Sequence, residues 1–203
     1  MLLNHTGIKI TEEKPDKISC IDDEARFCEY VGRAREGSSF CLTVNNISCP
    51  LARYNLGLEE HDKQKLEELA RTLVSWGDAD NRKRALNYLQ ETPVLDYGEK
   101  YISVFPLDKG IKRPDLVILF MTPDKLMPLA REVAKKTGDW NSYYMSGVGG
   151  MCTEVTAIPM VTGKLNFSLG CGGSRPHGRL EEGQLLSGLP YDTYNKYSSI
   201  INE

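Results

Sequence analysis

The stretch "PDLVILFMTPDKLMPLAREVAKKTG", residues 114–138, decides the fold class of this chain. Its first part, residues 116–121, is almost continuously apolar, as expected of a strand that is covered on both faces. Thr122 then supplies an N-cap, Pro123 a first helical residue and Gly138 a helix stop. Apolar residues recur at helical spacing between them, at Leu126, Leu129, Ala130 and Val133. A buried strand that leads directly into an amphipathic helix is typical of proteins that mix both kinds of element.

The rest of the chain continues this mixture. Patterns of alternation and β-branched residues predict further strands over 7–10, 38–44, 100–107, 142–147 and 164–171. Capping signals and apolar stripes predict further helices over 22–37, 49–58, 59–77, 78–93, 152–163, 180–190 and 191–202. The chain shows no internal repeat and no low-complexity linker, and 203 residues suffice for one sizeable core. We therefore expect an α/β or α+β fold: a single compact domain over residues 1–203, with a mixed central sheet flanked by helices.

The charge balance excludes some classes of partner. The chain has 25 basic and 28 acidic residues, a formal net charge of −3, which gives no electrostatic case for binding nucleic acid or an anionic membrane. No apolar run approaches the roughly 20 residues of a membrane-spanning helix, and the first residues lack the pattern of a signal peptide. We expect a cytoplasmic protein without nucleic-acid or membrane partners, and leave open whether it is an oligomer.

The six cysteines are the most informative residues. In a reducing cytosol, clustered cysteines serve metals or redox chemistry more often than disulfides, although any single one can be a small buried hydrophobe. Cys49 precedes Pro50 at a predicted helix start, where unpaired N–H groups favour the thiolate, so we expect its sulfur to be ionised. Cys152 follows the glycines of "GVGG", and Cys171 ends the strand predicted over 164–171. Cys41 lies inside the apolar segment "FCLTV", where we expect a neutral, packed thiol.

Four motifs together resemble a known family. The segments "RFCEYVGRAREG", "SCPLARYNLGL", "MCTEV…VTGK" and "LGCGGSR" are similar to the domain of unknown function 169 family of archaea and bacteria, and the resemblance extends from about residue 8 to the C-terminus. It implies a shared fold and a shared site, but no reaction. The family motifs fall on four cysteines, Cys28, Cys49, Cys152 and Cys171. Cys20 and Cys41 lie outside them.

Four motif cysteines are the number that a structural zinc ion or an iron–sulfur cluster needs. The chain has no C-x-x-C pair, which counts more against zinc than against a cluster. Our first hypothesis is therefore a cysteine-ligated metal centre, an iron–sulfur cluster with zinc as the alternative. Such a protein would have a redox or cluster-dependent role in anaerobic metabolism, with a redox partner that the sequence does not name.

A second hypothesis is a metal-free enzyme or small-molecule binder, and the sequence leaves open whether the protein is an enzyme. Glycine-rich turns and arginines suit a small phosphate or carboxylate, which gives a candidate anion site of Gly149, Gly150, Gly172, Gly173 and Arg175. Cys152 would be the nucleophile beside it, with His177 as the available base. Glu154 is either a general base, a ligand, or an acid that complements the start of a helix.

Overall fold

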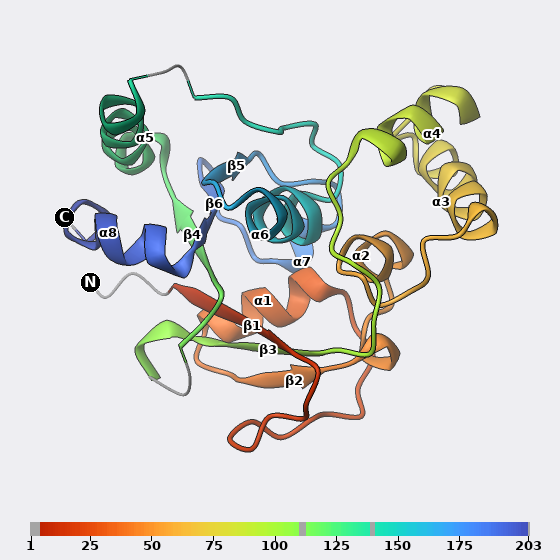
Figure 1. Ribbon diagram of the computed structural model, residues 1–203, viewed down its shortest axis with the longest axis horizontal. Coiled ribbons are helices and arrows are strands. Elements are labelled where there is room, and N and C mark those ends of the chain that lie inside the picture. Colours follow the sequence, from red (N-terminus) through yellow and green to blue (C-terminus); the bar gives the residue numbers. More distant parts are fainter. Residues whose placement is uncertain (1–4, 110–112, 139–140, 203) are drawn as a thin grey trace.

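The computed structural model describes residues 5–109, 113–138 and 141–202. Six strands alternate with helices along these segments (Figure 1). The strands are β1 (Thr6–Thr11), β2 (Phe40–Leu42), β3 (Tyr101–Pro106), β4 (Leu116–Met121), β5 (Asn166–Ser168) and β6 (Leu185–Pro190). The α-helices are α1 (Phe27–Arg35), α2 (Pro50–Asn55), α3 (Lys63–Trp76), α4 (Arg82–Glu91), α5 (Pro123–Thr137), α6 (Ile158–Thr162), α7 (Ser174–His177) and α8 (Tyr191–Ile201). Short 3-10 turns occupy Val44–Asn46 and Leu107–Lys109, and a π-helical segment spans Gly150–Ala157.

The strands form one sheet in the order β2-β3-β1-β4-β6-β5. Each ladder between neighbouring strands is antiparallel. The strand-to-helix unit of residues 116–137 is present, with β4 followed by α5, but β4 pairs with β1 and β6 without any parallel neighbour. A central sheet flanked by helices in one compact domain, as the sequence predicted, is confirmed, but the sheet is antiparallel and not mixed.

Both faces of β4 are covered, which explains its continuous run of apolar residues. Leu116, Ile118 and Phe120 belong to the larger core, with residues of α1 and of the π-helical segment. The alternate residues of the strand, Val117, Leu119 and Met121, belong to a second core with α5 and α8. Because side chains alternate across a strand, one six-residue segment contributes to two cores.

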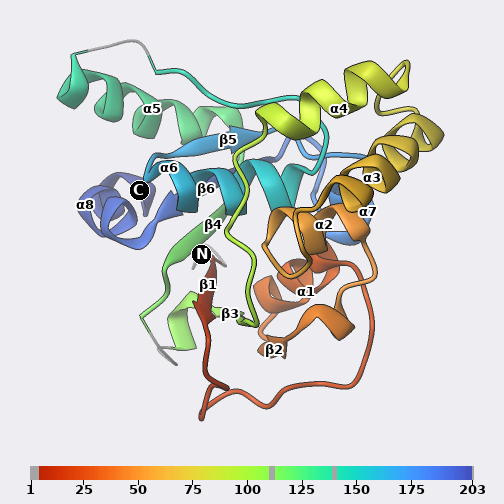
Figure 2. The same cartoon turned by 45° about the vertical axis from the view of Figure 1, so that its right-hand side comes forward.

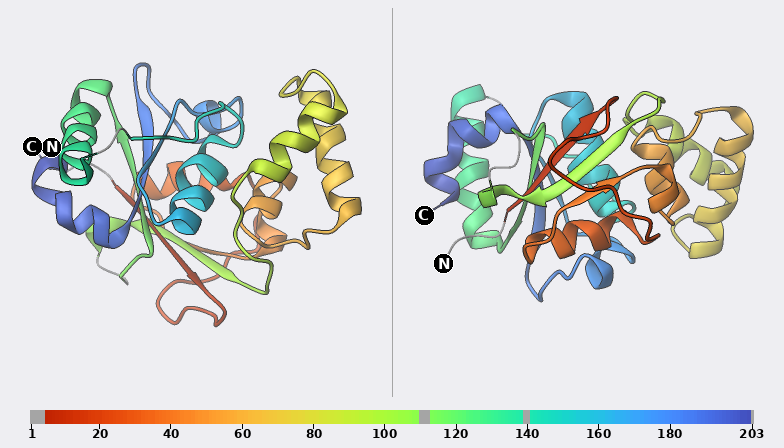
Figure 3. Two further views of the ribbon diagram at one scale, coloured as in Figure 1. Left: turned by 45° about the horizontal axis from the view of Figure 1, so that its top comes forward. Right: turned by 90° about the horizontal axis from the view of Figure 1, so that it is seen from below.

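The helices divide between two ends of the molecule. Helices α5 and α8 lie at one end, and the hairpin of α3 and α4 lies at the other (Figures 1 and 3). This hairpin packs through Leu69, Leu73 and Leu89 onto α2. Helices α1, α2 and α7 gather around the π-helical segment between the sheet and α3 (Figure 2). Among the helices that the structure describes, none has the length and apolar character needed to cross a membrane.

Two predicted elements are wrong. Residues 180–190 do not form a helix, because residues 185–190 are strand β6, paired with both β4 and β5. A glycine explains why this strand fits: a Cβ atom on Gly188 would collide with the backbone of Val155, so the π-helical segment packs directly on β6. Residues 142–147 do not form a strand either. The helix predicted over 152–163 is a π-helical segment followed by α6.

Cys41 is not the neutral, packed thiol that the sequence predicted. It forms a disulfide with Cys20, and the two Cα atoms lie 4.2 Å apart. Cys41 is in β2, and Cys20 makes a bridge beside it, so the disulfide fastens the segment before α1 to the edge of the sheet. The pattern of "FCLTV" identified a buried strand position but gave no signal for the partner, because Cys20 lies in an irregular segment.

Candidate functional site

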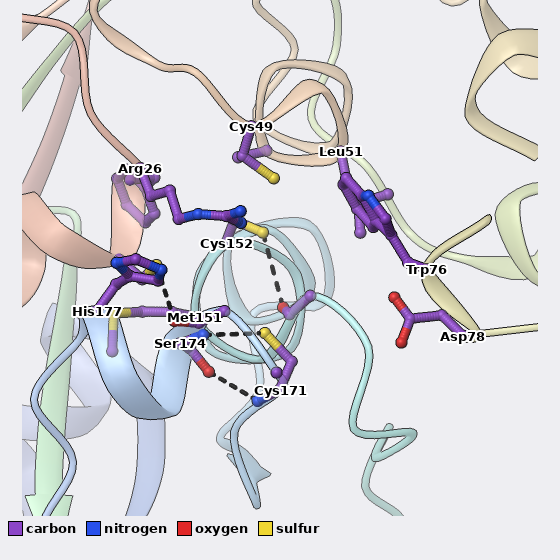
Figure 4. A pocket seen from close by; sticks show the side chains of 16 residues that line it. Arg26, Cys49, Leu51, Trp76, Asp78, Met151, Cys152, Cys171, Ser174 and His177 are labelled. Carbon is purple, nitrogen blue, oxygen red and sulfur yellow. Dashed lines mark hydrogen bonds between the residues drawn. The ribbon is translucent and has the colours of Figure 1, made fainter. Parts of the chain in front are cut away.

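The four motif cysteines line one cavity. Its volume is about 300 Å³, and Cys28, Cys49, Cys152 and Cys171 all contribute to its wall (Figure 4). They come from four separate parts of the fold: α1, the start of α2, the π-helical segment and the loop after β5. None of the four is in a disulfide. The structure thus gathers the thiols that the family motifs single out, and keeps Cys20 and Cys41 away from them.

Helix starts position two of these thiols. Cys28 is the second residue of α1, and its Sγ lies 3.6 Å from the carbonyl oxygen of Gly173. Cys49 is the N-cap of α2, with Pro50 as the first helical residue, as the sequence predicted. Within α2, no backbone N–H donates a capping hydrogen bond to the Cys49 side chain. The sulfur nevertheless stands at a helix start, where backbone N–H groups have no partner within the helix.

The π-helical segment positions Cys152. Gly149 precedes the segment with a φ of 66°, a left-handed conformation that favours glycine. The Cys152 Sγ lies 3.8 Å from the carbonyl oxygen of Gly149 and 3.6 Å from Oγ1 of Thr153. Asn55 of α2 donates to Thr153 Oγ1 through its side chain, which ties this segment to the helix that Cys49 caps.

A tight turn positions Cys171. Its backbone N–H donates to Ser174 Oγ at 2.7 Å, and its Sγ accepts from the Ser174 N–H at 3.2 Å. The two glycine-rich segments of the sequence also touch each other. A Cβ atom on Gly150 would lie 2.7 Å from Cα of Gly170, so only glycine permits this approach. The glycines beside Cys152 and Cys171 therefore allow two cysteine-bearing backbones to pack closely.

Burial favours the protonated form of Cys28, Cys49 and Cys152. Burial, followed by the neighbouring Cys171 and Cys49 thiols, raises the pKa of Cys28 to about 12. Burial also raises the pKa of Cys152 well above its usual value. Burial also raises the pKa of Cys49, which opposes the expectation that its sulfur is ionised. A metal ion reverses this balance, since a coordinating thiol loses its proton.

Several lining residues were not identified from the sequence. The cavity wall includes three such residues, Arg26, Trp76 and Asp78. It also includes His177, which the sequence analysis named. Arg26 had a usable signal, because it stands at the start of the motif "RFCEYV". Trp76 and Asp78 had none, because they come from the end of α3, which reaches the cavity only through the packing of the α3–α4 hairpin.

Only some of the candidate anion-binding residues lie at the cavity. Gly149, Gly172 and Gly173 line the cavity, whereas Gly150 and Arg175 are not among its lining residues. The Arg175 guanidinium donates to the carbonyl oxygen of Leu169 at 2.6 Å. Arg26 is the arginine that stands within the cavity.

Glu154 is engaged away from the thiols. Its carboxylate is 1% exposed and accepts hydrogen bonds from the N–H groups of Ser146 and Gly147. It also accepts from the hydroxyl groups of Ser146 and Ser168. Glu154 thus joins the turn before Cys152 to the strand before Cys171. Its four donors give it a structural task, and it is not among the residues that line the thiol cavity.

The structure contains no preformed cluster of metal-binding side chains. Among the residues that it describes, no three His, Cys, Asp or Glu side chains are arranged to hold a metal ion. The four thiols share a cavity wall, and their mutual electrostatic influence is evident in the raised pKa of Cys152, to which Cys49, Cys171 and Cys28 all contribute after burial.

Comparison with known proteins identifies a family for the chain but no reaction. The model of family DUF169, described as "Uncharacterised ArCR", matches residues 5–199. The uncharacterized protein MJ0308 of Methanocaldococcus jannaschii is 24% identical over 184 residues, which cover 90% of this chain and 78% of that protein. No solved structure matches the chain significantly.

Proposed function

The chain belongs to the DUF169 family, and from that premise we propose that Cys28, Cys49, Cys152 and Cys171 ligate an iron–sulfur cluster. The observation that carries the proposal is that these four thiols, distant in sequence, line one cavity. Four cysteines are the complement that such a cluster requires. The cluster would supply one-electron transfer, in a redox or cluster-dependent role in anaerobic metabolism.

The size of the cavity supports a cluster over zinc. A single ion with Zn–S bonds of about 2.3 Å needs four sulfurs drawn tightly around one point. The cavity that the thiols line together with twelve other residues measures about 300 Å³, which leaves room for a larger, multinuclear group. The Ser174 N–H that donates to the Cys171 sulfur supports the same proposal, because hydrogen bonds to ligand sulfur are one means by which proteins stabilise iron–sulfur clusters and set their potentials.

The alternative of a Cys152 nucleophile has less support. A nucleophilic cysteine needs a lowered pKa or a base within hydrogen-bond reach. Burial raises the pKa of Cys152 instead, and its hydrogen-bond partners are the Gly149 carbonyl and the Thr153 hydroxyl, neither of which is a base. A small anionic ligand at the cavity stays a secondary proposal, with Gly149, Gly172 and Gly173 among its lining residues.

Purification without oxygen tests the proposal. We expect a brown protein that contains iron and acid-labile sulfide, and that loses its visible absorption in air. Iron and sulfide would be quantified per chain, and zinc measured in the same sample. Zinc alone, or no metal after anaerobic reconstitution with ferrous iron and sulfide, would contradict the proposal.

The proposed cytoplasmic location is tested in the same material. The Cys20–Cys41 disulfide weighs against a compartment that keeps all thiols reduced. Alkylation of protein in freshly lysed cells, followed by mass spectrometry, would count the blocked thiols. A cytoplasmic location predicts that Cys20 and Cys41 are reduced and alkylated, and protection of this pair would contradict it.

A further inference from the structure

The cavity that the four thiols line also contains a guanidinium group. Arg26 is the residue directly before α1, and its side chain extends into the cavity (Figure 4). Its positive charge lowers the pKa of both Cys28 and Cys49, although burial outweighs that effect. One arginine thus acts electrostatically on two of the proposed ligands.

The loop after β5 leaves room for this guanidinium. A Cβ atom on Gly173 would lie 3.2 Å from Arg26 Nη1 and 3.9 Å from Cys171 Sγ. The absence of a side chain at Gly173 therefore lets the guanidinium lie against the turn that holds Cys171. Arg26 Nη1 and Cys171 Sγ therefore both border the position at which a side chain of residue 173 would begin.

Within residues 5–109, 113–138 and 141–202, no carboxylate forms an ion pair with Arg26. The two arginines within α1 have partners. Arg35 forms an ion pair with Glu181, and the Arg33 guanidinium lies over the rings of Tyr30 and Phe40. Asp78 lines the same cavity but makes no ion pair with Arg26, and Figure 4 shows it on the opposite side. Because an opposite charge stabilises a partly buried cation, the unpaired Arg26 suits a cavity that holds a negatively charged group.

We propose that Arg26 stabilises the reduced state of the centre and so raises its reduction potential. The inference rests on the proposed function. Four thiolates leave a cluster negatively charged, and reduction adds one electron to the iron–sulfur core without making or breaking a bond in the protein. A nearby fixed positive charge favours the more negative state, and burial strengthens that attraction because solvent screens it less.

The test compares variants that alter this charge. Arg26→Gln removes it and keeps a polar side chain, Arg26→Lys keeps it on a different group, and Arg84→Gln removes an exposed arginine of α4 that pairs with Asp80 far from the cavity. Each protein would be purified without oxygen and its iron and sulfide measured. The cluster would then be titrated with dithionite, which donates the electron, and followed by visible absorption and electron paramagnetic resonance.

We expect Arg26→Gln to retain iron and to have a more negative midpoint potential. The expected change in the ratio of reduced to oxidised centre is about tenfold at a fixed potential, which is about 59 mV for a one-electron couple. Arg26→Lys should recover most of the shift, and Arg84→Gln should match the unmodified protein. Equal potentials in the Arg26→Gln and unmodified proteins, or an equal shift in Arg84→Gln, would overturn the inference while leaving the cluster in place.

A second variant tests the inference if Arg26→Gln does not assemble the cluster. If Arg26→Gln contains no iron, Gly173→Ala takes its place, because the backbone of Gly173 is in the right-handed helical region and accepts alanine while the added methyl group crowds the guanidinium. We expect the same direction of shift, and an unchanged potential would overturn the inference. Absence of iron and sulfide from the unmodified protein would instead remove the proposed function and this inference together.

Discussion

At the scale of single residues, two cysteines that lie eight positions apart have opposite chemical settings. Cys49 is a free thiol at the cavity, and Cys41 is oxidised in a disulfide with Cys20. Cys49→Ser should lose or degrade the metal centre, because serine keeps the helix cap but replaces a soft thiolate ligand. Metal per chain, measured after anaerobic purification, checks this expectation.

The matched control is the double variant Cys20→Ser/Cys41→Ser. It removes two cysteines but none of the four at the cavity, so we expect full metal content. Loss of a cross-link over 21 residues of sequence separation should lower the free energy of unfolding by about 3 kcal/mol in the chain-entropy model. Equal metal retention in Cys49→Ser and the control would mean that Cys49 is not a ligand.

His5 makes stability depend on pH. Its ring is 5% exposed, its Nε2 has no hydrogen-bond partner among the residues that the structure describes, and burial lowers its pKa from 6.5 to about 4. Because the unfolded chain binds the proton more readily, His5 favours unfolding as the pH falls from 6.5 towards 4, and the effect vanishes above 6.5. The shift corresponds to about 3 kcal/mol at most.

His5→Phe isolates that contribution, since phenylalanine keeps a ring beside Tyr194 and does not titrate. Urea denaturation at pH 4.5 and pH 7 should show a smaller loss of stability in the variant than in the unmodified protein. Identical losses in the two proteins would show that the neutral form of His5 is not what the fold requires.

At the scale of elements, Glu154 connects the two glycine-rich segments. Its carboxylate receives donors from Ser146, Gly147 and Ser168, which precede Cys152 and Cys171. In Glu154→Gln the amide nitrogen replaces an acceptor with a donor, which leaves buried donors facing each other. We expect a loss of about 1–3 kcal/mol in the free energy of unfolding, which is the cost of an unsatisfied buried group.

We also expect Glu154→Gln to lower metal retention, although Glu154 is not among the residues that line the cavity. Glu182→Gln, at an exposed position between α7 and β6, is the control and should change neither quantity. A variant that is destabilised but retains its full metal would show that the network supports the fold without positioning the thiols.

The same elements show how far the sequence predicts this fold. Strong local signals were sufficient for β4 and α5, because a continuous apolar run and two helix caps leave few alternatives. The interpretation of 180–190 as a helix was wrong because short apolar segments with glycine carry no clear period. What makes residues 185–190 a strand is their place between β4 and β5, which is tertiary information.

The cavity was predictable only through the motifs. No spacing in the chain indicates that Cys28 and Cys171 meet, since 143 positions separate them in the numbering. The shared motifs selected the four residues, and the fold supplies their proximity. Arg26, Trp76 and Asp78 depend on how α1 and the α3–α4 hairpin pack, so local pattern could not assign them.

At the scale of the whole molecule, the cavity joins segments from both halves of the chain. Its thiols come from α1, α2, the π-helical segment and the loop after β5, so a group bound to all four would connect most of the fold. A ligand that binds only the folded state stabilises it by mass action, by about 4 kcal/mol at 1,000 times its dissociation constant.

Removal of the metal should therefore lower the melting temperature of the whole domain. For a chain of this size, about 4 kcal/mol corresponds to a shift of roughly 8–16 °C. Differential scanning calorimetry of anaerobic protein, before and after chelation of iron, checks this, with Cys49→Ser as the control that should show no difference between the two treatments. One cooperative transition should move as a unit, because the four ligands are spread across the domain. If chelation removes the iron and leaves the melting temperature unchanged, the metal binds at the surface and not between these four segments.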